Sequence, residues 1–168
     1  MGEIKVFFEK SSNRSDVYKL LETAFEKIYG TLMPSLQKNE NGKPYFPERP
    51  DIYFSLSHSG EYVMCAISDS PVGCDIQKYQ KISDKMQKRV FTEKELENSN
   101  SLALWTLKES FVKLCGELDR EYKDMEFLKR EDAFYGPDNT YGVLINEISG
   151  YTAAICAYNV ENVKVLML

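Results

Sequence analysis

Apolar positions with helical spacing mark the clearest element near the start of the chain. They recur at intervals of 3-1-3-1-3, the spacing of an amphipathic helix: Val17, Leu20, Leu21, Ala24, Phe25 and Ile28. We expect this helix to begin after Ser12 or Asn13 and to end at Gly30, because glycine commonly follows the last helical turn. A strand is predicted before it, over residues 3–8.

The middle of the chain is predicted to alternate between strands and turns. A polar turn over residues 38–42 leads into an extended segment, because three closely spaced prolines disfavour a helix there: Pro44, Pro47 and Pro50. Strands are expected over residues 52–56, 62–67 and 72–76. The segment 57–60 is rich in serine and glycine, and we interpret it as the turn between the first two of these strands.

Helical patterns dominate the next part of the chain. The basic stretch over residues 78–90 is expected to be helical, and Thr92 with Glu95 fits a capping box that opens another helix. Residues 102–115 carry the strongest later helical pattern, which Gly116 ends. Three closing strands are predicted, over residues 141–148, 151–157 and 163–168.

A short internal similarity suggests two related halves. Residues 63–66 (VMCA) resemble residues 154–157 (AICA) in residue type and in their expected strand position. We therefore expect an α+β fold that forms a single unit over residues 1–168. Its halves, roughly 1–78 and 79–168, would each consist of a helix packed on an antiparallel sheet.

Composition limits the classes of function. The 168 residues include 21 basic and 26 acidic ones, and the net charge of -5 argues against nucleic acid as a partner. No stretch approaches the ~20 apolar residues of a membrane span, and the charged N-terminus is unlike a signal peptide. We therefore expect a cytoplasmic protein. Its four cysteines form no C-x-x-C pair, which favours reduced, mostly buried thiols over a zinc site: Cys65, Cys74, Cys115 and Cys156.

Two carboxylates and one lysine are candidates for chemistry. Asp75 follows a glycine near the end of a predicted strand, where it is either a surface residue or a buried carboxylate that needs a partner. Glu109 and Lys113 are four residues apart on one helix face, and such pairs are often merely solvated. If the two carboxylates met in space, their hard oxygens would suit Mg²⁺.

Two further residues are candidates for holding phosphate. His58, the only histidine, lies in the segment rich in serine and glycine, where N–H and hydroxyl donors can cluster around an anion. Lys43 precedes a proline in the extended segment. Each residue alone is more often simply exposed to solvent, so the signal lies in their combination.

The order of these residues resembles that of the Sfp-type 4′-phosphopantetheinyl transferases. Members carry the blocks G-K-P, F-x-x-S-H-S-G, G-x-D-x-E and W-x-x-K-E-(S/A)-x-x-K in that order. The similarity extends from Arg14 to Lys113, with a looser match in the final strands. The matching blocks are Gly42-Lys43-Pro44, Phe54-Ser55-Leu56-Ser57-His58-Ser59-Gly60, Gly73-Cys74-Asp75-Ile76-Gln77 and Trp105-Thr106-Leu107-Lys108-Glu109-Ser110-Phe111-Val112-Lys113.

The resemblance implies an activity and a fold. Phosphopantetheine would pass from coenzyme A to a serine of an apo acyl or peptidyl carrier protein, with Mg²⁺ present and 3′,5′-ADP released. The fold would be that of the family, with two pseudo-symmetric halves. By resemblance, Asp75 and Glu109 hold the metal and Lys113 contacts the pyrophosphate. The nucleotide end would be held by Lys43, Ser57 and His58, with Arg14 at the 3′-phosphate.

The chain departs from the family pattern at one metal position. Gln77 replaces the second acid of the G-x-D-x-E block, which removes a negative charge while keeping a carbonyl oxygen that could bind the metal directly or through water. We expect Mg²⁺ to be held more weakly as a result. Glu109, or a water molecule, would then take the proton of the carrier serine.

A basic segment indicates where the partner docks. Between Lys78 and Lys94 lie six basic and two acidic residues, against a net charge of -5 for the whole chain. By resemblance this region docks a carrier protein, and such proteins are typically acidic. Ile82, Met86 and Val90 recur at helical spacing, and we expect Val90 to be buried and Met86 to contact the partner. The single chain of two halves suggests a monomer.

Two rival interpretations remain open. A family member with little activity would bind coenzyme A or a carrier protein without transfer, and Gln77 favours this alternative. A different Mg²⁺-dependent nucleotide enzyme would turn over ATP or another nucleotide and ignore carrier proteins.

Overall fold

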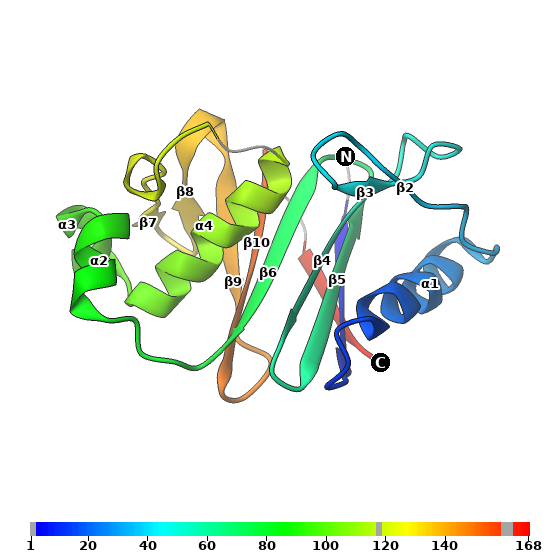
Figure 1. Ribbon diagram of the computed structural model, residues 1–168, viewed down its shortest axis with the longest axis horizontal. Coiled ribbons are helices and arrows are strands. Elements are labelled where there is room, and N and C mark those ends of the chain that lie inside the picture. The colour runs from blue at the N-terminus through cyan, green and yellow to red at the C-terminus, as the bar shows by residue number, and fades with distance from the viewer. Residues whose placement is uncertain (1–2, 117–118, 159–162) are drawn as a thin grey trace.

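The computed structural model describes residues 3–116, 119–158 and 163–168. Within them, two sheets make up most of the structure (Figure 1). The first has the order β11 (Val163–Met167), β1 (Ile4–Lys10), β5 (Tyr62–Ser68) and β4 (Tyr53–Ser59). The second has the order β6 (Val72–Lys78), β10 (Tyr151–Ala157), β9 (Tyr141–Ile145), β8 (Ala133–Tyr135) and β7 (Leu128–Arg130).

Helices cover the outer faces of both sheets. Helix α1 (Asp16–Tyr29) packs on the first sheet and α4 (Ser101–Cys115) packs on the second (Figure 1). The remaining elements are short: α2 (Asp84–Val90), α3 (Glu93–Asn98), the 3₁₀ helices η1 (Tyr122–Asp124) and η2 (Pro137–Asn139), and the hairpin β2 (Gln37–Lys38) and β3 (Pro44–Tyr45).

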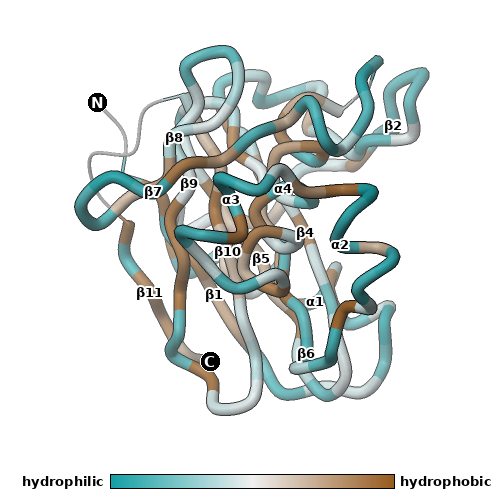
Figure 2. The backbone as a smooth tube through the Cα atoms, turned by 90° about the vertical axis from the view of Figure 1, so that its left-hand side faces the viewer, coloured by the Kyte–Doolittle hydropathy of each residue, from teal (hydrophilic) through white to brown (hydrophobic). Residues whose placement is uncertain are grey.

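The core is layered because strand side chains alternate between two faces. Val6 and Met64 of the first sheet pack with Cys74 and Ile155 of the second, while Phe7 of the same β1 strand faces α1. Figure 2 shows hydrophobic segments along β5 and β10, whereas most of α2 is hydrophilic. The chain is therefore a sandwich of two sheets between two helices, which confirms the predicted α+β class.

The two sheets repeat one connectivity. In the first, β1 leads through α1 to β4 and β5, and the strands lie in the order β1-β5-β4. In the second, β6 leads through α4 to β9 and β10, and the order is β6-β10-β9. The similar residues 63–66 and 154–157 lie in β5 and β10, which are interior strands of their sheets.

Serine hydroxyls join the two sheets along β4 and β6. Three alternate hydroxyls of β4, those of Ser55, Ser57 and Ser59, accept hydrogen bonds from alternate backbone N–H groups of β6 at 2.9, 3.2 and 2.8 Å. The donors are the N–H groups of Cys74, Ile76 and Lys78. The serine hydroxyls therefore provide hydrogen-bond acceptors for N–H groups of β6 that would otherwise need a neighbouring strand.

Several predicted elements need correction. Ser57 and His58 belong to strand β4, and the chain turns at Gly60 instead, where φ is +55°. Helix α2 begins only at Asp84, so the first part of the basic stretch is not helical. Strands β7 and β8 were not predicted.

The sheets are also less simple than expected. The first is mixed, because β11 pairs with β1 in parallel. The chain crosses between sheets, since β6 and β11 each belong to the sheet built mainly from the other half of the chain. The division into halves near residue 78 stays a prediction.

Two other expectations are met in the described residues. The capping box of Thr92 and Glu95 forms, and Gly116 ends α4. Cys65, Cys74 and Cys156 are buried thiols, whereas Cys115 is exposed.

None of the described helices combines the length and apolar character required to cross a bilayer.

Candidate functional site

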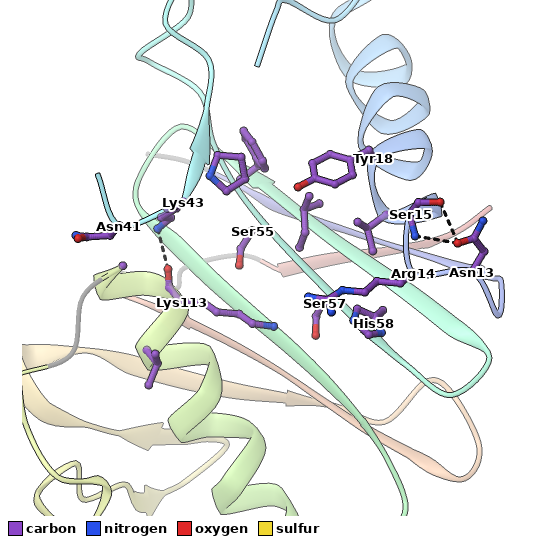
Figure 3. A pocket seen from close by; sticks show the side chains of 17 residues that line it. Asn13, Arg14, Ser15, Tyr18, Asn41, Lys43, Ser55, Ser57, His58 and Lys113 are labelled. Atoms are coloured by element: carbon purple, nitrogen blue, oxygen red, sulfur yellow. Dashed lines mark hydrogen bonds between the residues drawn. The ribbon is translucent and has the colours of Figure 1, made fainter. Parts of the chain in front are cut away.

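A cavity of about 780 Å³ lies where the N-terminus of α1, strand β4, the β2–β3 hairpin and the end of α4 meet. Five residues singled out from the sequence line it, and Figure 3 shows their side chains around one opening. They are Arg14, Lys43, Ser57, His58 and Lys113. Segments separated by up to a hundred positions in the chain therefore contribute to a single surface.

The charged side chains that line the cavity are basic. Among the described residues that line it, Arg14, Lys43 and Lys113 are basic and none is acidic. Partial burial lowers the pKa of His58, and the positive charges of Arg14 and Lys113 lower it further. The charge of Asp75 raises the pKa of His58 and so acts in the opposite direction.

Glycine at position 73 allows α4 to lie directly on β6. A Cβ atom there would lie 2.0 Å from the carbonyl oxygen of Ser110 and 2.5 Å from the backbone nitrogen of Leu114. Asp75 is two residues further along the same strand, so its side chain points to the same face, toward α4. The close packing of strand and helix thus brings Asp75 next to the residues of α4.

Asp75 is almost fully buried and accepts three hydrogen bonds. Its Oδ1 accepts from Nζ of Lys113 at 2.7 Å and from the hydroxyl of Ser57 at 2.8 Å. Its Oδ2 accepts from the amide nitrogen of Gln77 at 2.7 Å. Lys113 therefore pairs with Asp75 rather than with Glu109, its neighbour on the helix.

Glu109 lies on α4, one turn before Lys113. Burial raises its pKa and the negative charge of Asp75 raises it further, while the hydroxyl of Tyr122 and the charge of Lys113 act in the opposite direction. The hydroxyl of Tyr122 donates to Oε1 of Glu109. Burial and the Glu109 carboxylate raise the pKa of Tyr122 far above its ordinary value, so the phenol keeps its proton and remains a donor.

Lys43 has an unexpected contact. Its Nζ donates to the carbonyl oxygens of Lys113 at 2.7 Å and Leu114 at 3.2 Å, and burial lowers its pKa. These carbonyls belong to the last turn of α4, where a cation is favourable. Lys43 therefore ties the β2–β3 hairpin to the helix that carries Glu109 and Lys113.

The donor atoms of the predicted metal ligands are of the type that Mg²⁺ prefers. In the described part of the chain, no cluster of three or more His, Cys, Asp or Glu side chains forms a self-sufficient metal site. Mg²⁺ is commonly bound through one or two carboxylates together with water and substrate phosphates. Asp75, Glu109 and the amide of Gln77 carry oxygens of the kind that Mg²⁺ binds, whereas a thiol or imidazole set would suit other metals. None of the three lines the basic cavity, but Asp75 pairs with Lys113, which does.

Sequence reasoning missed Tyr122, which contacts Glu109. Its segment is dominated by charged residues and carries no motif, so only the tertiary structure identifies it. Trp105 of α4 is partly buried and stacks on the ring of Tyr122.

Comparison with known proteins identifies the family of the chain. Residues 71–156 match the family model described as the 4′-phosphopantetheinyl transferase superfamily. A 4′-phosphopantetheinyl transferase of Bacillus subtilis is 37% identical over 111 residues, which are 58% of this chain and 49% of that protein.

Two further relatives are 41% identical. The 4′-phosphopantetheinyl transferase Sfp of Bacillus subtilis (strain 168) aligns over 46% of this chain and 39% of its own length. The 4′-phosphopantetheinyl transferase gsp of Aneurinibacillus migulanus aligns over 48% and 38%. The chain spans about half or less of the length of these relatives. Since the family model covers half of the chain, the chain belongs to the 4′-phosphopantetheinyl transferase superfamily.

Proposed function

We propose that this chain transfers the 4′-phosphopantetheine group of coenzyme A to a serine of an apo acyl or peptidyl carrier protein and releases 3′,5′-ADP. The observation that carries the proposal is the basic cavity beside the Asp75–Lys113 pair, in a chain that belongs to this family. Coenzyme A carries a 3′-phosphate and a pyrophosphate, and both suit a cavity lined by cations.

Each residue of the cavity has a proposed task. Arg14 and His58 lie at the α1 end of the cavity and hold the 3′-phosphate. Lys113 lies beside Asp75 and stabilises negative charge on the pyrophosphate as 3′,5′-ADP leaves. Lys43 fixes the hairpin against the end of α4, and Ser57 orients Asp75.

The carboxylates have two proposed tasks. Asp75 and Glu109 hold Mg²⁺, with Gln77 contributing its amide oxygen directly or through water, and the bound ion would neutralise charge on the pyrophosphate. The serine oxygen forms a bond to the phosphorus that bears pantetheine, and the bond from that phosphorus to the 3′,5′-ADP oxygen breaks. Glu109, or a water molecule that it holds, takes the serine proton, because burial makes this carboxylate more basic than an exposed one.

The proposed docking site of the carrier centres on α2. Lys85 and Lys88 are exposed there, Val90 is buried and Met86 is 38% exposed. Met86 and Val90 line a second cavity of about 340 Å³ together with Trp105 and Tyr122, and the hydroxyl of Tyr122 donates to Glu109. An acidic carrier surface would be steered to this region.

The wider organisation is also proposed. The repeated strand–helix–strand–strand connectivity supports two pseudo-symmetric halves. We further propose that the protein acts as a monomer in the cytoplasm.

A second candidate function is supported by Gln77. A neutral amide in place of an acid weakens the attraction for a divalent cation, so the chain would bind coenzyme A or a carrier protein with little transfer. The retained Asp75, Glu109 and Lys113 favour the transferase.

A single assay separates these functions. The protein is incubated with Mg²⁺, coenzyme A and an apo carrier protein, and 3′,5′-ADP is measured by chromatography. Release that requires the carrier supports transfer, whereas coenzyme A binding without release supports the second candidate. Turnover of ATP with no dependence on the carrier indicates a different nucleotide enzyme.

A further inference from the structure

Tyr122 is held against Glu109 by its side chain. Its ring stacks on Trp105 of α4, with the ring centroids 5.1 Å apart and the planes 9° from parallel. Its hydroxyl donates to Oε1 of Glu109, which lies one helical turn beyond Trp105. A stacked ring has few alternative orientations, so the direction of the hydroxyl is set by the helix that also carries its acceptor.

The backbone of Tyr122 is held as well. Nζ of Lys108 donates to the carbonyl oxygens of Tyr122 and Val90, both at 2.8 Å, and to Oε2 of Glu95 at 2.9 Å. These three bonds use all three protons of an ammonium group. The side chains of Lys108 and Glu95 are both fully buried, so this network is screened from solvent.

Glu95 completes the network. Its carboxylate also accepts from the backbone N–H groups of Thr92 at 2.8 Å and Phe127 at 2.9 Å. Helices α2, α3 and α4 and the 3₁₀ helix η1 are therefore joined at one buried ion pair. The segment that carries Tyr122 is thus fixed in place although η1 has only three residues.

The hydrogen bond from Tyr122 leaves the two oxygens of Glu109 in different states. Oε1 is occupied by the phenol, and within the described part of the chain Oε2 accepts no hydrogen bond. Oε2 is therefore available for a cation or for a hydroxyl proton. A carboxylate that is held through one oxygen presents the other oxygen in a fixed direction. Residues that hydrogen-bond to a metal ligand typically orient that ligand in this way.

We infer that Tyr122 is a positioning residue that orients Glu109 toward the metal and the acceptor serine. This inference rests on the proposed function. It also gives the Lys108–Glu95 ion pair a role in the site, because that pair places Tyr122.

The variant Tyr122→Phe tests the inference, since it keeps the stacked ring and removes only the hydroxyl. Binding of Mn²⁺ in the presence of coenzyme A, measured by electron paramagnetic resonance, should weaken at least about tenfold. The kcat for carrier modification should fall by a similar factor, while the KM for coenzyme A stays unchanged because the cavity side chains are untouched. Tyr151→Phe is the matched control, since it removes a phenol that accepts from the N–H of Glu61 away from the site.

A double-mutant cycle shows whether Tyr122 acts through Glu109. In a Glu109→Gln background, adding Tyr122→Phe should change Mn²⁺ affinity by less than about twofold. The inference would be overturned if Tyr122→Phe bound Mn²⁺ as tightly as the wild type, or if the substitution lowered Mn²⁺ affinity equally in both backgrounds. It would also be overturned if the wild-type protein bound no Mn²⁺. Mn²⁺ binding that depends on Tyr122 without any carrier modification would leave the positioning role intact and reject the transferase function instead.

Discussion

Nζ of Lys113 lies 2.7 Å from Oδ1 of Asp75, and this ion pair joins α4 to β6 at the edge of the basic cavity. The carboxylate is almost completely buried, whereas the lysine side chain is 31% exposed. The lysine can therefore turn toward a ligand in the cavity, while the carboxylate stays fixed between Ser57 and Gln77.

Lys113→Met should destabilise the protein. It leaves the buried Asp75 carboxylate without its cation, so the free energy of unfolding measured with denaturant and without Mg²⁺ should fall by about 1–3 kcal/mol. Added Mg²⁺ should recover part of this loss, and Lys113→Arg should lose less. If Lys113→Met unfolds at the same denaturant concentration as the wild type, the ion pair does not stabilise the β6–α4 contact.

Gln77→Glu should increase the affinity for metal and lower the stability of the metal-free protein. The substitution removes the amide donor to Oδ2 of Asp75 and places a second negative charge beside it. Mn²⁺ affinity should rise about tenfold, and the unfolding free energy without metal should fall by about 1–3 kcal/mol.

Gln77→Ala is the matched control for this pair of effects. It also removes the donor but adds no charge, so it should lose stability without gaining metal affinity. Equal Mn²⁺ affinities in Gln77→Glu and the wild type would show that position 77 lies away from the metal.

Binding of coenzyme A should depend on pH through His58. Burial and the charges of Arg14 and Lys113 lower its pKa in the free protein, and a nearby phosphate would raise it. Affinity gained from the protonated imidazole is therefore fully present below the pKa of the free protein and is lost as the pH rises through the higher pKa of the complex. Calorimetric titrations between pH 5 and 8 should show a steeper decline in the wild type than in His58→Gln. Parallel pH profiles would place the phosphate away from His58.

Lys85→Glu combined with Lys88→Glu should weaken encounter with the carrier protein. The KM for an acidic apo carrier should rise at low ionic strength, by about tenfold or more, and the difference should shrink in high salt because exposed charges are screened. The kcat should hold, since neither lysine lines the basic cavity.

The control for this experiment changes the same charge elsewhere. Lys27→Glu combined with Lys164→Glu alters exposed lysines of α1 and β11. If both double variants change the KM equally, the effect comes from net charge and not from docking on α2.

Much of the fold could be predicted because local signals and packing agree. The apolar stripe that includes Leu20 and Leu21 produced α1, and Gly116 ended α4 as expected. Serine and glycine are typical turn residues, so the sequence predicts a turn at Ser57 and His58, which lie in strand β4. In the structure the alternate serines of β4 instead supply hydroxyls to the backbone of β6, a contact that no local pattern indicates.

The candidate site was predictable in its motifs and not in its supporting contacts. Motif order was enough to indicate Asp75, Glu109 and Lys113. The position of Tyr122 depends instead on the buried Lys108–Glu95 pair. These two residues are 13 positions apart in the sequence, and only the tertiary structure brings them together. Likewise, the parallel pairing of β11 with β1 joins opposite ends of the chain.

Intact-mass spectrometry of an apo carrier protein provides the decisive measurement. After incubation with the protein, Mg²⁺ and coenzyme A, the carrier serine should gain one phosphopantetheine group. Asp75→Ala and Glu109→Ala, confirmed to be folded, should abolish that gain. A carrier that stays unmodified with the wild type, or is modified equally by both variants, would contradict the proposal that these two carboxylates direct transfer from coenzyme A.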